Sequence, residues 1–257
     1  MKKTLAIIFT LLMITSVFAA GAKEKIVITT AEDLDGKKIG VQAGTTGELY
    51  VQESVQDAKL ISFKTGMDAA LDLKNGAIDA IVLDELPAKE IVARNPSLEI
   101  VDLELATEAY AIAVKKGDAE LLASINKTIA DMKANGEYEA LVNAFMPVDG
   151  NIVVPSTVAI NTDKVVKLGT NAAFPPFEYV DGKNIVGFDI SMGEKIAVGY
   201  GAKLEVVDMA FDSLIPALAS GAIDFIAAGM SVTEERKKNV DFSDPYYESK
   251  QVVIIRK

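Results

Sequence analysis

The stretch Ala227–Arg236 has the sequence AAGMSVTEER, and an apolar run leads into it. That run predicts a buried strand that ends at Gly229, where the polar residues begin. Ser231 and Thr233 are residue types that cap helix N-termini, and the two glutamates that follow suit a first helical turn containing Arg236. The sequence therefore predicts a corner at which a strand ends and a short helix begins.

Such a corner has a defined chemistry. At the carboxyl end of a strand it directs free backbone N–H groups, a hydroxyl group and a guanidinium group to one point, which suits a small carboxylate. The alternative is a capped surface helix in which Arg236 pairs with a nearby glutamate or aspartate. These residues alone leave both interpretations open.

The composition limits the class of protein. The chain has 257 residues, half of them apolar, and a net charge of −11, which allows one large or two modest packed domains. Two lysines, an apolar run and small residues predict a secretory signal peptide over residues 1–20 that is removed on export. The acidic surface disfavours nucleic acid and anionic lipid as partners.

Histidine and cysteine are both absent from the sequence. The first absence excludes His-based acid–base catalysis, Ser-His or Cys-His nucleophile pairs and the usual zinc sites. The second excludes disulfides, thiolate chemistry and a lipid anchor on cysteine after the signal peptide. We therefore expect a periplasmic protein with no catalytic residues, no metal site and no cofactor.

A second corner is predicted near the N-terminus. Residues 37–41 form a strand pattern that runs into QAGTTG, residues 42–47, before a helical segment. Its glycines, such as Gly44, permit close backbone approach, and Thr45 and Thr46 place hydroxyl groups beside a helix N-terminus. The segment lacks the lysine of a phosphate loop, so we expect no nucleotide site.

Two further positions are candidates. The buried strand 77–83 ends on Asp84, which is either a functional carboxylate or the cap of the next helix. Phe174 precedes two prolines that hold the chain extended, so its ring is expected to be displayed. Phe177 is expected in the core.

An internal repeat links residues 65–84 and 210–231. Each segment predicts a helix, a glycine stop, the tetrapeptide Gly-Ala-Ile-Asp and a strand ending in a polar corner. Two such units predict two lobes with mainly parallel sheets, although four identical residues can also recur by chance. Residues 147–163 predict a linker in which 152–154 form a stray edge strand, and residues 25–29 predict a short strand.

Together these segments resemble the periplasmic amino-acid-binding proteins of ABC importers, the polar-amino-acid class of solute-binding protein family 3. The likeness lies in GTNAAFPPF (169–177), GFD (187–189), FDSLIPAL (211–218), GMSVTEER (229–236), DFSDPYY (241–247) and KIGVQAGTTG (38–47). Family members usually begin with the equivalent of residue 165 onward and reach the equivalent of 26–146 afterwards. The chain therefore resembles a circularly permuted member.

The resemblance implies an α/β fold of two lobes with mixed, mainly parallel sheets, a hinge and a central cleft. The implied units are lobe 2 at 24–108 plus 251–257, lobe 1 at 112–246 including the permutation linker 147–163, and hinges near 107–111 and 246–250. If this is right, residues 252–255 must pair inside lobe 2 although they are distant from it in sequence.

The resemblance also implies a ligand site in the cleft. Arg236 would hold an α-carboxylate, Asp84 would take the α-ammonium group, and two phenylalanines would sandwich the side chain. The implied set is Arg236, Asp84, Thr45, Thr46, Ser231, Gly229, Met230, Phe174, Phe211 and Asn171. Asn171 stands where relatives that take cationic amino acids often have Asp, which, with Leu83 and Gln42, favours an uncharged polar side chain.

The implied function is that of a monomeric receptor which binds a free L-amino acid. By hinge closure it would deliver this ligand to an ABC permease in the inner membrane. One alternative is an enzyme resembling periplasmic cyclohexadienyl dehydratases, with Glu178 or Asp189 as its acid. Another is a sensory module that presents its closed form to a membrane receptor.

Overall fold

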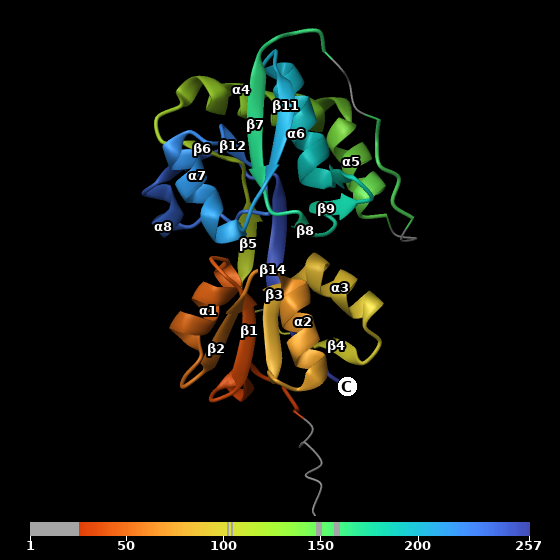
Figure 1. Cartoon of the computed structure of the whole chain (residues 1–257), viewed down its shortest axis with the longest axis vertical. Helices are drawn as coiled ribbons and strands as arrows, with labels where there is room; N and C mark the ends of the chain where they lie inside the picture. Colours follow the sequence, from red (N-terminus) through yellow and green to blue (C-terminus); the bar gives the residue numbers. More distant parts are fainter. Residues whose placement is uncertain (1–25, 102, 104, 148–150, 157–159) are drawn as a thin grey trace, which may run out of the picture.

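The computed structural model describes residues 26–101, 103, 105–147, 151–156 and 160–257. The predicted signal peptide lies outside these residues. Two lobes, each built on its own sheet, are joined by strands β5 (Thr107–Tyr110) and β14 (Tyr247–Arg256) (Figure 1). Within the described part of the chain, no helix has the length and apolar character needed to span a membrane.

The lower lobe of Figure 1 contains most of the N-terminal elements. They are η1 (Ala31–Leu34), β1 (Lys38–Gln42), α1 (Thr46–Ser54), β2 (Lys59–Phe63), α2 (Gly66–Asn75), β3 (Ala80–Asp84), α3 (Glu85–Arg94) and β4 (Leu98–Val101). The strand order is β2-β1-β3-β14-β4, in which β1 is parallel to β2 and β3. The sheet is mixed, as the resemblance implies, but parallel pairs are not its majority, because β14 runs antiparallel to both β3 and β4.

Strand β14 completes the centre of this sheet from the far end of the sequence. It runs antiparallel to β3, with Val252 opposite Leu83, and to β4, with Val253 opposite Val101. The pairing expected for residues 252–255 is therefore present. Alternate side chains point to opposite faces, so Val252 and Ile254 join the apolar cluster containing α2 and α3, whereas Val253 packs towards α1. Both faces are covered, which explains why residues 252–255 of this strand are all apolar.

The upper lobe contains the remaining elements. They are β6 (Ala113–Lys115), α4 (Ala119–Asn135), α5 (Glu137–Phe145), β7 (Val165–Thr170), β8 (Ala173–Phe174), β9 (Glu178–Asp181), β10 (Asn184–Val186), α6 (Phe188–Gly199), β11 (Lys203–Asp208), η2 (Phe211–Ser213), α7 (Leu214–Ser220), β12 (Phe225–Ile226), α8 (Glu234–Lys237) and β13 (Val240–Phe242). The main sheet has the order β11-β7-β12-β6-β13, with β11 and β12 parallel to β7, and β8 to β10 form a small separate sheet.

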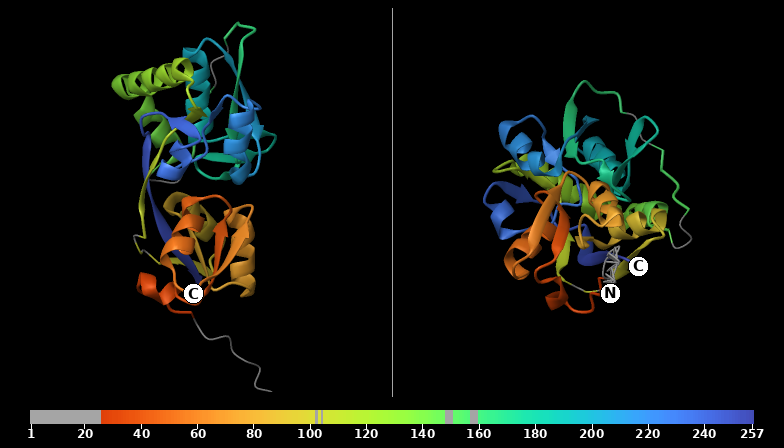
Figure 2. Two further views of the ribbon diagram at one scale, coloured as in Figure 1. Left: turned by 90° about the vertical axis from the view of Figure 1, so that its left-hand side faces the viewer. Right: turned by 60° about the horizontal axis from the view of Figure 1, so that its bottom comes forward.

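The two lobes are connected by a pair of antiparallel strands. Tyr247 lies opposite Tyr110 and Lys250 lies opposite Thr107, so β5 pairs with the first part of β14. Both strands run from one lobe to the other along one side of the molecule (Figure 2, left). These two strands are the segments at which the resemblance implies the hinges.

Two predicted strands are wrong. The described residues 26–29 form no strand, because the backbone N–H groups of Thr29 and Thr30 donate to the Asp33 carboxylate, at 2.8 and 3.0 Å, and cap η1. Residues 152–154 form no strand either, since Val153 makes a single backbone hydrogen bond to Ala144 of α5.

Candidate functional site

The corner after β12 directs Arg236 inward. Thr233 caps α8 by accepting the Arg236 N–H at 3.1 Å, and the guanidinium turns back so that Nη1 donates to the Ser231 carbonyl at 2.7 Å. Nη2 donates across the cleft to the Gly44 carbonyl at 2.9 Å. Arg236 is buried and, among the described residues, no carboxylate lies within ion-pair distance of it. The surface-helix alternative is therefore wrong.

The backbone of this corner is specific to glycine. Gly229 has a φ of +52°, and a Cβ atom there would lie 2.8 Å from the ring of Phe174. Its N–H donates to the carboxylate of Asp189 at 2.8 Å. The absence of a side chain thus lets the Phe174 ring approach the loop that presents Ser231 and Arg236.

The second corner faces the first from the lower lobe. Thr45 caps α1, because its hydroxyl accepts the Glu48 N–H, and it also donates to the Gln42 carbonyl at 2.8 Å. The Gln42 side chain donates to Asn171 at 2.8 Å and so crosses from one lobe to the other. With the Arg236–Gly44 bond, this contact places the two corners on opposite walls of one cavity.

Asp84 occupies the N-cap position of α3, but its side chain caps nothing. Instead it accepts a hydrogen bond from the hydroxyl of Tyr110 on hinge strand β5. Burial, and next the charge of Glu108, raise the pKa of Asp84 to about 8. The capping explanation is therefore wrong, and Asp84 is a buried carboxyl group at the end of β3.

Aromatic rings form the side walls of the cavity between the two corners. Phe174 and Phe211 are both buried against the cavity, and the Arg236 guanidinium carbon lies 5.4 Å from the Phe211 ring centroid. Phe177 is fully buried and packs edge-on against Tyr110, at 5.2 Å between ring centroids. Phe177 belongs to the core, as the sequence predicts, whereas Phe174 lines the cavity but is itself buried in the same apolar cluster.

These side chains line a cavity with an empty volume of about 280 Å³, including space open to solvent. Its lining consists of Gln42, Thr45, Thr46, Asp84, Asn171, Phe174, Glu178, Phe211, Ala228, Gly229, Ser231 and Arg236. Of the implied site residues, only Met230 is absent, because its side chain packs with the apolar cluster around Leu214 and Ile223. Among the described residues, no group of acidic side chains is arranged to hold a metal ion.

Glu178 is a wall residue that the sequence analysis named only as a candidate acid of an enzyme. It is fully buried, and neither carboxylate oxygen receives a hydrogen bond from a described donor. Burial and the neighbouring charge of Asp189 raise the pKa of Glu178 well above its ordinary value. A protonated Glu178 can donate to Asp189, whose own pKa burial raises to about 6. The sequence signal was a glutamate directly after the core residue Phe177.

Two other residues of the site were missed. Glu108 accepts hydrogen bonds from the Ser231 hydroxyl at 2.6 Å and from the Gln251 side chain at 3.1 Å. Both lie on the hinge strands, which the sequence shows as ordinary alternating segments. No local pattern marks them, because only the pairing of β5 with β14 brings them to the cavity.

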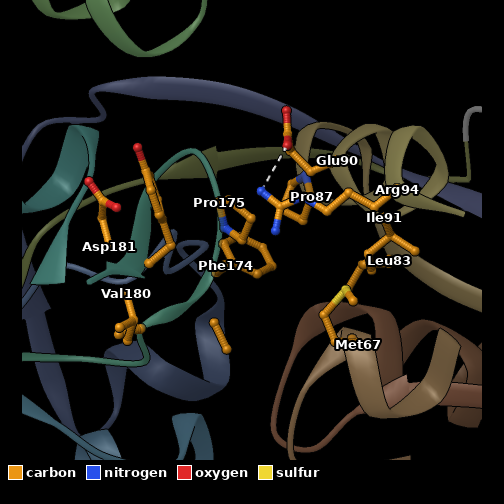
Figure 3. A pocket seen from close by; sticks show the side chains of 14 residues that line it. Met67, Leu83, Pro87, Glu90, Ile91, Arg94, Phe174, Pro175, Val180 and Asp181 are labelled. Atoms are coloured by element: carbon orange, nitrogen blue, oxygen red, sulfur yellow. Dashed lines mark ion pairs between the residues drawn. The ribbon is translucent and has the colours of Figure 1, made fainter. Parts of the chain in front are cut away.

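A larger cavity, with an empty volume of about 860 Å³ including space open to solvent, lies on the other side of Phe174. Phe174 and Pro175 line one wall, and Met67 and Leu83 line the other (Figure 3). Its lining includes charged residues, of which Arg94 pairs with Glu90 at 3.6 Å (Figure 3). The smaller cavity is the candidate site, because polar groups from both lobes converge on it.

Comparison with known proteins finds similarity over part of the chain. Residues 166–257 match the family model of the bacterial extracellular solute-binding proteins, family 3. It covers β14 and nearly all of the upper lobe from β7 onward, including the Arg236 corner.

Individual relatives match over part of their length. Over 94 residues the chain is 47% identical to the "Arginine-binding extracellular protein ArtP" of Bacillus subtilis (strain 168), covering 37% of each chain. Over 123 residues it is 33% identical to the "L-cystine-binding protein TcyJ" of Escherichia coli (strain K12), covering 48% of this chain and 46% of that protein. The solved structure of holo ArgBP from T. maritima is 54% identical, covering 32% of this chain and 37% of that chain, with a TM-score of 0.32. The chain thus spans less than half the length of each of these relatives.

Proposed function

We propose that the protein is a periplasmic, monomeric receptor that binds a free L-amino acid between its lobes and delivers it to an ABC transporter of the inner membrane. The main support is the convergence of Arg236 from the upper lobe and Asp84 from the lower lobe on one buried cavity. A guanidinium and a carboxylate complement the two ends of a zwitterion. The family, and relatives named as binding arginine, histidine and cystine, support the same substrate class.

The roles follow from the geometry of the walls. Arg236 would hold the ligand carboxylate together with the Ser231 hydroxyl and the N-terminal end of α1 at Thr45 and Thr46. Asp84 would accept from the α-ammonium group. Burial strengthens both contacts, because the cavity has a lower effective dielectric constant than water. Phe174 and Phe211 would pack against the side chain, as the resemblance implies.

The position of Glu178 in the cavity wall helps to predict which type of side chain the ligand has. The sequence favours an uncharged polar side chain, and Asn171 in the cavity wall is consistent with it. Neither oxygen of Glu178 accepts a hydrogen bond from a described donor, so this carboxyl group in the same wall favours a ligand side chain that donates hydrogen bonds. We therefore include amides and cations, with L-glutamine and L-arginine as the representative ligands.

We propose binding without turnover. The buried pair Glu178 and Asp189 would be the acid of the dehydratase alternative, but the relatives are named for binding. Incubation with a cyclohexadienyl carboxylate separates the two functions, because only the enzyme forms an aromatic product. A sensory role differs from transport in its partner, so a pull-down from membranes scored for permease or receptor tests that alternative.

We also propose that the chain is a circularly permuted family member, divided as residues 24–108 plus 251–257, residues 112–246, and hinges near 107–111 and 246–250. The support is the central place of β14 in the sheet of the lower lobe. Ile28 and Ile255 share one apolar cluster, so the segments that the permutation would separate pack together. Joining residue 257 to residue 26 and opening the chain within 147–163 should preserve folding and ligand binding.

A thermal-shift screen against the twenty amino acids tests the proposed function. A ligand that binds only the native state raises the melting temperature by mass action. We expect a shift with L-arginine or L-glutamine and none with putrescine or succinate, which lack one end of the zwitterion. The absence of a shift with every amino acid would contradict the substrate class.

A further inference from the structure

A buried carboxylate on the hinge connects both lobes to the candidate site. Glu108 on β5 accepts from Ser231 of the upper lobe at 2.6 Å and from Gln251 of β14 at 3.1 Å. The same Gln251 nitrogen lies 3.4 Å from the hydroxyl of Thr46 in the lower lobe. Glu108 is therefore hydrogen-bonded to the hinge and to groups that line the cavity, although its side chain is absent from the lining.

Glu108 also faces Asp84. The ionisable groups around Asp84 are Glu108 and Tyr110 from β5, Glu178 from β9 and Arg236 from α8. One cation thus faces three carboxyl groups, and all four of these residues are buried. The pKa of Asp84, raised to about 8 by burial and then by the charge of Glu108, means that Asp84 holds a proton at neutral pH. An ammonium ligand, in contrast, requires the ionised form of Asp84.

We propose that Glu108 is a positioning residue that keeps a proton on Asp84, and that this proton passes to solvent when an α-ammonium group binds, so that the Asp84–Glu108 pair makes ligand affinity depend on pH. The Asp84 O–H bond breaks and its electron pair stays on the carboxylate, which then accepts from the ammonium group. Glu108 keeps its bonds from Ser231 and Gln251. This inference rests on the proposed function and deepens it.

Calorimetry with L-arginine in buffers of different ionisation enthalpy counts the protons released. At pH 6.5 we expect about one proton per ligand, and between pH 6 and 7.5 we expect affinity to rise by up to about tenfold per pH unit. Binding without proton release would overturn the inference and leave the proposed function intact. Absence of binding from pH 6 to 9 would overturn both.

Comparison of two variants tests whether Glu108 causes the proton release and the pH dependence of affinity. Glu108→Gln keeps the shape and removes the charge, so we expect fewer protons released at pH 6.5 and a pH profile displaced to lower pH. Glu248→Gln removes an exposed carboxylate from the other hinge strand and should leave both unchanged. Equal weakening at every pH in Glu108→Gln, with an unchanged proton count, would show a merely structural role and overturn the inference.

A titration of the unliganded protein tests the same inference without relying on ligand binding. Carboxyl ¹³C NMR should show Asp84 ionising at higher pH in the wild type than in Glu108→Gln. An Asp84 that ionises in its ordinary range in the wild type would overturn the inference even if Glu108→Gln fails to fold.

Discussion

Arg236 and Asp84 are both buried, but the fold compensates their burial in different ways. Two backbone carbonyls accept from the guanidinium of Arg236, so its charge is retained although burial lowers its pKa. Asp84 has Tyr110 as a donor, and neighbouring carboxyl groups favour its neutral form. Arg236 is therefore already charged for a ligand carboxylate, whereas Asp84 must lose its proton before it accepts from an ammonium group.

Replacement of Arg236 should abolish most of the binding. Arg236→Met removes the donor for the α-carboxylate, and we expect a loss of about 2–5 kcal/mol in binding free energy, measured by calorimetry. Lys237→Met, which removes an exposed cation one residue along the same helix, is the control and should bind normally. Equal affinities in the two variants would remove Arg236 from the site.

Stability should fall as the pH rises through the neutral range. The pKa of Asp84 is about 8 in the folded protein and near its ordinary value of 3.8 in the unfolded chain, so the folded state binds more protons between these two pH values. The raised pKa values of Asp189 and Glu178 act in the same direction.

The unliganded protein should therefore melt at a lower temperature at pH 8 than at pH 5.5. Asp84→Asn should reduce this difference, because it removes the titrating group. Asp131→Asn, on the exposed face of α4, should leave it unchanged. A melting temperature that rises from pH 5.5 to 8 would contradict the assignment.

At the scale of elements, β14 has two environments. Its first part pairs with β5 in the hinge, and its last part lies between β3 and β4 with both faces buried. The same strand therefore connects the lobes and completes the core of one of them. A weakened β14 should affect folding more than an ordinary terminal strand would.

Ile254→Ala tests this role. Ile254 is fully buried between β3 and β4, so we expect a loss of about 2–5 kcal/mol in the free energy of unfolding, measured with chemical denaturant. Val165→Ala truncates a side chain that is 48% exposed at the start of β7 and should change stability little. Similar small effects in both variants would show that β14 contributes little to the core.

At the scale of the whole molecule, the two lobes meet through a few polar contacts. The Gln42–Asn171 and Arg236–Gly44 bonds span the cleft, and the hinge strands connect the lobes at one side (Figure 2). A ligand that touches both corners makes more contacts when the cleft is closed, so its binding should favour that form.

Small-angle X-ray scattering measures this closure. We expect the radius of gyration to decrease when saturating amino acid is added to the wild type. It should stay constant in Arg236→Met, which lacks one of the cleft-spanning contacts. A wild-type radius that is unchanged at saturation would contradict hinge closure.

Much of the site was predictable because local sequence forms it. Each corner is a strand, a glycine-containing turn and a capped helix within about ten residues, so Arg236, Ser231, Thr45 and Thr46 follow from residue types and spacing. Phe174 was expected to be displayed because two prolines follow it, but its ring is buried where it lines the cavity. The short N-terminal strand was mispredicted because Asp33 satisfies backbone N–H groups that a strand would have used.

The sequence by itself determined the α/β class and the two corners, because hydrophobic periodicity and capping act over short distances, and its resemblance to a known family implied the candidate groups for a zwitterion. Only the tertiary structure decided that Asp84 is not a helix cap, that Met230 faces the core and that Glu178, Glu108 and Gln251 join the site. These outcomes depend on β5 and β14, which are distant in sequence and whose pairing brings carboxyl groups from separate segments into one environment with little water. Local sequence patterns do not specify which carboxyl groups lie close together, and this closeness shifts the pKa values of those groups.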